Sequence, residues 1–171
     1  MTTTESPIHL RSPEARDGKT VWELVRAGGT LEANTPYCYL LLCSHFAENC
    51  IVAEKRGEIV GFIMAYRPPS DPEAVFVWQV GVAPAGRGQG LATKMLDRLI
   101  AQPGNFDARF LIATVDPDNA PSNKLFAAFA RGQGATLETE TGYGPELFPP
   151  GHAPEPLLRI GPLPTRARNS D

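Results

Sequence analysis

Three glycines at alternate positions, Gly86, Gly88 and Gly90, follow a run of β-branched and aromatic residues and precede a helix-like pattern. Bare backbone at the start of a helix presents N–H groups at the positive end of the helix dipole, where phosphate or pyrophosphate binds. Neither common phosphate motif is present. A P-loop needs Gly-Lys-Ser/Thr where Gly86-Arg87 stands, and a dinucleotide fingerprint needs a third glycine where Leu91 stands.

The segment Arg87-Gly88-Gln89-Gly90-Leu91-Ala92 fits the pattern R-x-x-G-x-A and resembles the GCN5-related N-acetyltransferase superfamily. The resemblance implies that the amides of this loop hold the pyrophosphate of coenzyme A. It also implies that Val80 and Val82 offer main-chain groups to the pantetheine arm and thioester carbonyl, and that Asn119 and Asn123 bind the pantetheine arm. From the residues alone, the glycines could instead turn a tight corner, and either asparagine could be only a helix cap.

Acetyl transfer to an amine sets requirements on the acceptor side. An amine attacks only after losing a proton, so the site needs carboxylates to hold a cationic acceptor and a base or water to take the proton. Glu32 and Glu155 lie in polar or Pro/Gly-rich connections and are candidates, although each could be a plain surface charge. Trp78 could lie in the core or meet an ammonium by cation–π contact. His152, between Gly151 and Ala153, could bind the acceptor or stay exposed and idle.

Longer segments resemble one family within the superfamily, the L-2,4-diaminobutyrate acetyltransferases of ectoine biosynthesis. They are Thr20 to Val25, Leu31 to Leu40, Phe62 to Pro69, Phe76 to Val80, Gly151-His152 and Leu158 to Pro162. The resemblance implies transfer from acetyl-CoA to the 4-amino group of L-2,4-diaminobutyrate, and a homodimer. It places the residues Glu32, Tyr37, Trp78, His152 and Glu155 around the acceptor.

One position departs from the superfamily. Many members have a tyrosine that protonates the departing thiolate where this chain has Phe126, so the general acid and the general base are unassigned. The missing tyrosine favours an alternative, a non-catalytic acetyl-CoA-binding module. Another alternative is an acetyltransferase for a different small amine or a protein N-terminus, although the Pro/Gly-rich loop at 142–156 argues for a closed site.

The elements that must position these residues follow from periodicity and turn residues. We expect an edge strand at 8–10, helices near 17–28 and 37–47, a hairpin of 50–54 with 58–66, and a central strand at 75–82 buried on both faces. A helix at 91–100, a strand at 109–115, a helix at 120–130 and strands at 135–141 and 157–160 follow. The helix near 37–47 carries Leu40, Leu41, Leu42 and Phe46. This order is that of the acetyltransferase fold, so the resemblance implies an α/β fold with a mostly antiparallel mixed sheet splayed at the coenzyme A site.

Composition limits the remaining possibilities. A chain of 171 residues suits one domain, here 8–161, with a disordered start at 1–7 and a flexible tail at 162–171. The net charge of −3 predicts no nucleic-acid partner, and no apolar run is long enough to predict a membrane span. Three cysteines without CxxC spacing predict buried thiols, no metal site and a cytoplasmic protein.

Overall fold

A tight hairpin and a strand–loop–helix unit form the centre of the fold. The computed structural model describes residues 6–166, and in them the expected order of elements is confirmed. The strands are β1 (Ile8–Arg11), β2 (Ile51–Lys55), β3 (Glu58–Tyr66), β4 (Ala74–Val82), β5 (Phe110–Thr114), β6 (Thr136–Tyr143) and β7 (Glu155–Gly161). The α-helices are α1 (Asp17–Gly28), α2 (Pro36–His45), α3 (Leu91–Ile100) and α4 (Ala120–Gln133).

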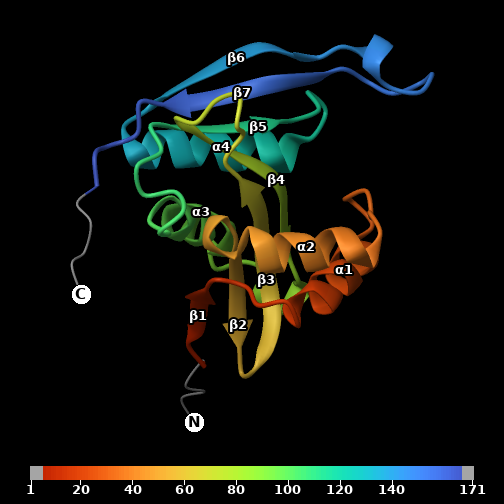
Figure 1. Ribbon diagram of the computed structural model, residues 1–171, viewed down its shortest axis with the longest axis vertical. Helices are drawn as coiled ribbons and strands as arrows, with labels where there is room; N and C mark the ends of the chain where they lie inside the picture. The colour runs from red at the N-terminus through yellow and green to blue at the C-terminus, as the bar shows by residue number, and fades with distance from the viewer. Residues whose placement is uncertain (1–5, 167–171) are drawn as a thin grey trace.

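The described strands form one sheet in the order β1-β2-β3-β4-β5-β7-β6 (Figure 1). Among these strands only β4 and β5 pair in parallel, joined by a crossover through α3, so the mixed, mostly antiparallel sheet is confirmed. Their pairing is short, because it joins Ala74–Phe76 to Phe110–Ile112 and goes no further. Beyond Phe76 the two strands separate, and this opening is the expected splay.

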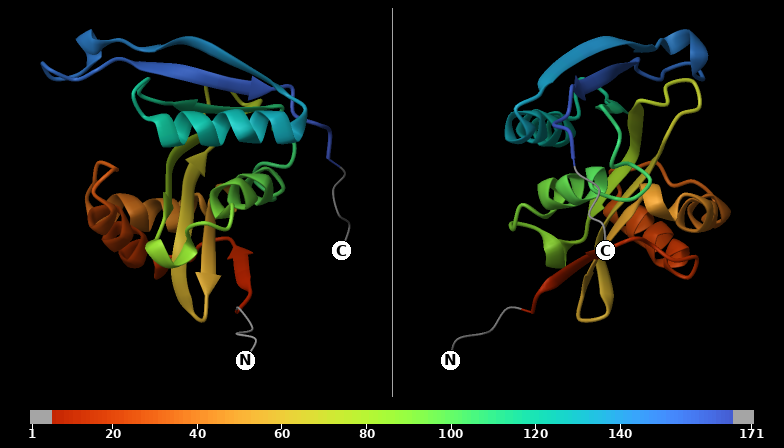
Figure 2. Two further views of the ribbon diagram at one scale, coloured as in Figure 1. Left: turned by 180° about the vertical axis from the view of Figure 1, so that it is seen from behind. Right: turned by 60° about the vertical axis from the view of Figure 1, so that its left-hand side comes forward.

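Helices cover both faces of the sheet (Figure 2). Helices α1 and α2 lie on one face over β3 and β4, while α3 lies on the other over β2, β3 and β4, next to α4. Each face has its own apolar core. The α3/α4 core includes Ile63, Val75, Val77, Leu96, Leu111 and Phe129, and the α1/α2 core includes Val21, Val25, Tyr39, Phe62 and Met64.

Helix α2 buries only part of its apolar surface. Tyr39, Leu42 and Cys43 are buried, whereas Leu40 and Phe46 are about two-fifths exposed. Because the helix Pro-Tyr-Cys-Tyr-Leu-Leu-Leu-Cys-Ser-His is apolar on every side, periodicity alone cannot select the face that packs.

The C-terminal third also differs from expectation. Strand β7 lies between β5 and β6, so β6 forms the edge of the sheet, and the strands leave a shorter loop than 142–156 between Tyr143 and Glu155. A loose tail from 162 is wrong for 162–166. Leu163 is buried and its N–H donates to the Arg109 carbonyl at 2.7 Å, and Arg166 donates to the Ile100 carbonyl at 3.0 Å. Residues 1–5 and 167–171, also expected to be disordered or flexible, lie outside the described residues.

Candidate active site

Strand β4 changes the direction of its side chains halfway along. Met64 of β3 pairs with Gln79 and Ala65 pairs with Val77, so Trp78 is an extra residue in a β-bulge. A bulge breaks the alternation of side chains between the two faces. As a result both Trp78 and Gln79 reach the α1/α2 side, where Trp78 packs against Tyr39 with ring centroids 5.8 Å apart and Gln79 contacts the Tyr39 hydroxyl. The expectation that β4 is buried on both faces therefore holds only partly, since Trp78 is half-buried.

The connection between α1 and α2 carries Glu32 and lies against this bulge. The Glu32 carbonyl accepts a hydrogen bond from Gln79 Nε2 at 2.9 Å, while the residue itself is exposed. Two residues on, the Asn34 carbonyl accepts from Trp22 Nε1 at 3.0 Å. Tyr37 follows in the first turn of α2 with its side chain 64% exposed. The hydrogen bond from Gln79 thus holds the Glu32 backbone against the strand that carries Trp78, while Tyr37 stays exposed at the start of α2.

Glu155 and His152 lie on the other side of the splay, beyond β5. Glu155 begins β7, and its Oε2 accepts a hydrogen bond from Thr114 Oγ1 at 2.9 Å, which fixes the carboxylate at the end of β5. Its Oε1 lies 3.9 Å from His152 Nε2. The imidazole stacks on Phe148 with ring centroids 3.9 Å apart and 9° between planes. The β6–β7 tip and the α1–α2 connection lie on the same side of the molecule (Figures 1 and 2).

The glycine loop has the geometry that phosphate binding requires. Gly90 is the N-cap of α3 at φ 63°, and Gly88 has φ 79°, both in the left-handed region that favours glycine. A Cβ added to either would meet no protein atom within 4 Å, so their backbones face open space. Gly90 has no side chain to cap the first amides of α3, whereas Asn119 caps α4 by accepting from Ser122 N–H at 3.2 Å. The exposed amides fit an anionic ligand.

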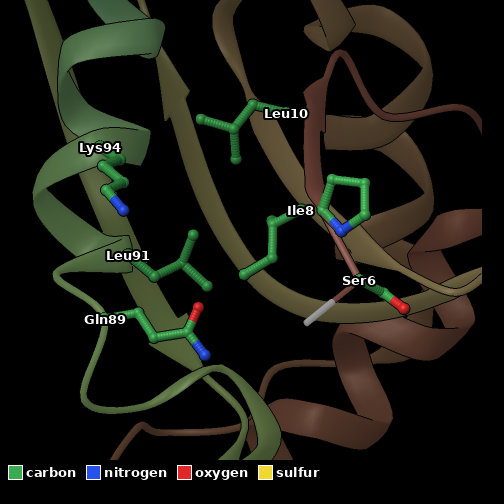
Figure 3. Close-up of a pocket in the computed structure, with 7 residues that line it drawn as sticks. Ser6, Ile8, Leu10, Gln89, Leu91 and Lys94 are labelled. Atoms are coloured by element: carbon green, nitrogen blue, oxygen red, sulfur yellow. The ribbon is translucent and has the colours of Figure 1, made fainter. Parts of the chain in front are cut away.

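The remaining loop residues have separate roles. Arg87 is exposed, and its Nε donates to the Val82 carbonyl at 3.4 Å, which ties the loop to the end of β4. The side chain of Leu91 is buried in the core, so only its N–H is available to a ligand. Beside the loop, a cavity of about 240 Å³ lies between β1 and the first turn of α3 (Figure 3). Gln89 and Lys94 line it with Ile8, Leu10 and Leu91.

The start of α4 contains the two asparagines. Asn119 serves as the helix cap, and Asn123 Nδ2 donates to the carbonyls of Asp116 and Asn119 at 3.2 and 2.9 Å. Asn123 also lines a cavity of about 480 Å³ between α4, β6 and β7. Phe126 is buried in the α3/α4 core. Because phenylalanine has no acidic proton, this position cannot protonate the departing thiolate. Within residues 6–166, no cluster of three His, Cys, Asp or Glu side chains could hold a metal ion.

Sequence reasoning missed three residues that hold the candidate site together: Gln79, Tyr39 and Thr114. Gln79 and Tyr39 are buried polar side chains, and Thr114 orients Glu155. The sequence does contain one signal of the bulge that directs Gln79 to the α1/α2 side. In Val77-Trp78-Gln79-Val80-Gly81-Val82 the valines are spaced by three and then by two, which is the spacing that a bulge produces in a half-buried strand.

The splayed sheet with a glycine loop at the start of α3 defines the class, an acetyl-CoA-dependent acyltransferase. A family model described as acetyltransferase (GNAT) family matches residues 19–130. The L-2,4-diaminobutyric acid acetyltransferases of Halalkalibacterium halodurans and Streptomyces avermitilis are 40% and 42% identical to this chain. The alignments cover 94% and 93% of this chain and 85% and 92% of those relatives.

A solved structure is similar over nearly the same length. It is the diaminobutyrate acetyltransferase from Paenibacillus lautus in complex with its substrate L-2,4-diaminobutyric acid and coenzyme A. That chain is 47% identical with a TM-score of 0.87, and the match covers 92% of this chain and 96% of that one. This chain belongs to the L-2,4-diaminobutyric acid acetyltransferases within the GNAT family, which confirms the resemblance seen in the sequence.

Proposed function

We propose that the protein transfers the acetyl group of acetyl-CoA to the 4-amino group of L-2,4-diaminobutyrate, giving the precursor that is cyclised to ectoine. The observation that carries this proposal is the high similarity, 47% identity at a TM-score of 0.87, to an enzyme solved with diaminobutyrate and coenzyme A. The geometry supports it, because Glu32 and Glu155 lie on elements at the two sides of the β4–β5 splay.

The acceptor is a small dicationic amino acid, so it needs anionic partners and a surface for its methylene groups. Glu32 and Glu155 supply the carboxylates, and Trp78 and Tyr37 supply aromatic surface for the short spacer and an ammonium. His152 completes the set from the β6–β7 tip. When the N4 ammonium loses a proton to a base or water, its lone pair attacks the thioester carbonyl carbon. The C–S bond then breaks, the nitrogen releases its second proton as the amide forms, and the departing thiolate takes up a proton.

Acetyl-CoA lies along β4 in this proposal. The amides of residues 87–92 hold its pyrophosphate, the β5-facing main chain of Val80 and Val82 holds the pantetheine arm and thioester, and Asn119 and Asn123 support that arm from α4. Two observations support this path. The pairing of β4 with β5 ends at Phe76, so within the described residues the β5-facing edge of β4 has no strand partner from Val77 on, and the loop backbone at Gly88 and Gly90 faces open space.

A homodimer is part of the proposal. Helix α2 exposes Leu40 beside Tyr37, and the β6–β7 tip exposes Tyr143 and Leu147, the last at 65%. Apolar side chains gathered on a surface mark sites of association. Analytical ultracentrifugation over a dilution series should give twice the monomer mass, and Leu40→Glu or Leu147→Glu should lower it. A wild-type protein that sediments as a monomer at every concentration would contradict the dimer.

We place the protein in the cytoplasm. The cysteines Cys38, Cys43 and Cys50 are free thiols. Burial raises the pKa of the Cys43 and Cys50 thiols to about 12, so these two are unreactive core side chains. Within the described residues, no helix has the length and apolar character to cross a membrane.

The test of the proposed function is thiol release from acetyl-CoA with a panel of acceptors, followed by proton NMR of the product. Diaminobutyrate should release thiol and become acetylated at N4 alone, while peptide N-termini and monoamines should give only the background rate. Substantial N2-acetylation would contradict the regioselectivity. Absence of thiol release with diaminobutyrate, from protein that binds acetyl-CoA in calorimetry, would contradict the catalytic function.

A further inference from the structure

Gln79 is a polar side chain buried in the strand that carries the candidate site. It is 6% exposed, and both ends of its carboxamide are hydrogen-bonded. Its Nε2 donates to the Glu32 carbonyl at 2.9 Å, and its Oε1 accepts from the Tyr39 hydroxyl at 3.0 Å. The bulge at Trp78 is what allows this, because without the extra residue Gln79 would point to the α3/α4 core.

Tyr39 extends this contact along the α1–α2 connection. Its side chain is fully buried, and its hydroxyl accepts a hydrogen bond from the Asn34 N–H at 3.4 Å. Trp22 Nε1 donates to the carbonyl of the same Asn34 at 3.0 Å. The residues from Glu32 to Thr35 belong to no helix or strand, so side chains rather than a backbone ladder hold this connection in place.

We infer that Gln79 is a positioning residue for the acceptor, acting through the backbone of Glu32. The direction of a loop side chain follows its backbone, so a hydrogen bond to the Glu32 carbonyl sets where the carboxylate lies relative to Trp78, the neighbour of Gln79 on β4. A hydrogen bond in a buried site is more directional and stronger than one in water. The inference rests on the proposed role of Glu32 in holding the acceptor.

A purely structural role for Gln79 makes a different prediction. A buried hydrogen bond that only stabilises the fold would lower the melting temperature and leave both Michaelis constants unchanged in the folded protein. A positioning role should raise KM for diaminobutyrate and spare KM for acetyl-CoA, because the Gln79 side chain contacts the Glu32 carbonyl and the Tyr39 hydroxyl, whereas the proposed contacts to acetyl-CoA are main-chain groups of β4 and the glycine loop. The split between the two substrates is therefore the decisive measurement.

The experiment compares Gln79→Met with Gln102→Met. Gln102 is the matched control, because it is also a buried amide, 2% exposed, and donates to Ser12 Oγ and the Cys50 carbonyl away from the site. Both variants should lose stability. Only Gln79→Met should raise KM for diaminobutyrate, by about tenfold, the equivalent of one buried hydrogen bond. Hydrogen exchange should speed up at residues 30–35 in Gln79→Met and not in Gln102→Met.

A double mutant tests the route through Glu32. If Gln79 acts by holding Glu32, then Gln79→Met should have little further effect on KM in the Glu32→Gln background. The inference is overturned if the effects of Gln79→Met and Glu32→Gln on KM for diaminobutyrate are fully additive, or if Gln79→Met leaves this KM unchanged. In either case, activity of the wild-type protein on diaminobutyrate would still support the proposed function. Gln79→Glu is the second variant if Gln79→Met fails to fold, since it keeps the acceptor for Tyr39 and replaces the donor to the Glu32 carbonyl with an oxygen. A wild-type KM in Gln79→Glu overturns the inference in the same way.

Discussion

The carboxylate of Glu155 is held in place by a neutral partner, Thr114, so its charge remains available to a cationic acceptor. Glu155→Gln keeps the size of the side chain and removes that charge. Loss of one charge-assisted hydrogen bond of about 1.5–3 kcal/mol corresponds to a fall in kcat/KM for diaminobutyrate of roughly tenfold to 150-fold. Steady-state kinetics with both substrates varied should show this, with KM for acetyl-CoA unchanged.

The control for Glu155→Gln is Glu138→Gln, an exposed residue on the adjacent strand β6. It removes the same charge from the adjacent strand, away from the end of β7 that carries Glu155, so it separates a local contact from the general field of the protein. Equal kinetic effects of the two substitutions would contradict a contact between Glu155 and the acceptor.

Gly90 and Gly134 have nearly the same backbone conformation, at φ 63°, ψ 25° and φ 62°, ψ 26°, and neither has a protein atom within 4 Å of an added Cβ. Alanine at either position should therefore cost a similar amount of stability, about 1–2 kcal/mol. Only Gly90 lies on the loop that receives the pyrophosphate. Gly90→Ala should weaken coenzyme A binding by at least about tenfold in calorimetry, and Gly134→Ala should not.

An equal affinity for coenzyme A in folded Gly90→Ala and Gly134→Ala would show that the amide positions around Gly90 do not meet the phosphates. Comparing the two variants excludes backbone strain as the cause of any difference in coenzyme A affinity, because both substitutions introduce the same strain.

The sequence predicts some site residues better than others, for a physical reason. The glycine loop is contiguous, so its spacing alone specifies a strand, bare backbone and a helix start. Gln79 contacts Glu32 and Tyr39 across separations of 47 and 40 residues, and a bulge decides which face it reaches. Such contacts depend on tertiary register, which a single sequence does not reveal.

At the scale of elements, Asp17 joins β1 to α1. Its carboxylate accepts from Arg11 Nη1 at 2.7 Å and from the Glu14 N–H at 2.7 Å, and it is buried. Burial alone would raise the pKa of Asp17, but the hydrogen bonds from Arg11 and the Glu14 backbone outweigh it, so the pKa lies below its usual value. The ionised carboxylate therefore favours the folded state.

Asp17→Asn should lower the free energy of unfolding at pH 7 by about 2 kcal/mol, the size of a charge-assisted hydrogen bond. Because the folded pKa lies below the unfolded one, this contribution is complete above the ordinary aspartate pKa of about 3.9 and is lost as the pH falls further. Urea unfolding from pH 7 to pH 3 should show the difference from wild type narrowing only below about pH 4.

The control for Asp17→Asn is Glu23→Gln in the same helix, whose exposed pair with Lys19 at 3.8 Å contributes little. It should leave stability nearly unchanged at every pH. A difference between Asp17→Asn and wild type that widens as the pH falls would contradict a lowered pKa of Asp17 in the folded protein.

Element boundaries followed local signals where those signals were strong. The turn Arg56-Gly57, both at positive φ, ends β2 and starts β3, and Gly29 at φ 65° ends α1 near the predicted position. Helix α4 runs three residues further than expected, to Gln133, because the residue able to stop it is Gly134. The position of β7 between β5 and β6 rests on pairing between strands far apart in the chain, which the order of the elements along the sequence does not specify.

At the scale of the whole molecule, the candidate acceptor site is assembled from distant parts of the chain. Glu32 and Tyr37 come from the first quarter, Trp78 from the middle, and His152 and Glu155 from the last segment. The Glu32 backbone is tied to β4 through Gln79, and the Glu155 carboxylate is tied to β5 through Thr114, so these two strands form the two arms of the splay. The separation of the two arms is therefore set by a packed sheet and not by loops, which gives the site a fixed span.

A fixed span predicts selection by spacer length. Diaminobutyrate has one asymmetric handle, its α-ammonium and α-carboxylate, and a site that acetylates only N4 must anchor that end. Reacting atoms must approach within about 3–3.5 Å, and a misplacement near 1 Å can cost about a hundredfold in rate. Ornithine, one methylene longer, and 2,3-diaminopropionate, one shorter, should therefore have kcat/KM about a hundredfold lower than diaminobutyrate. Competition assays should still show both binding, because the α-end contacts are common to all three. Equal kcat/KM values for the three acceptors would mean that the two arms of the sheet adapt to the acceptor and do not select it by the length of its spacer.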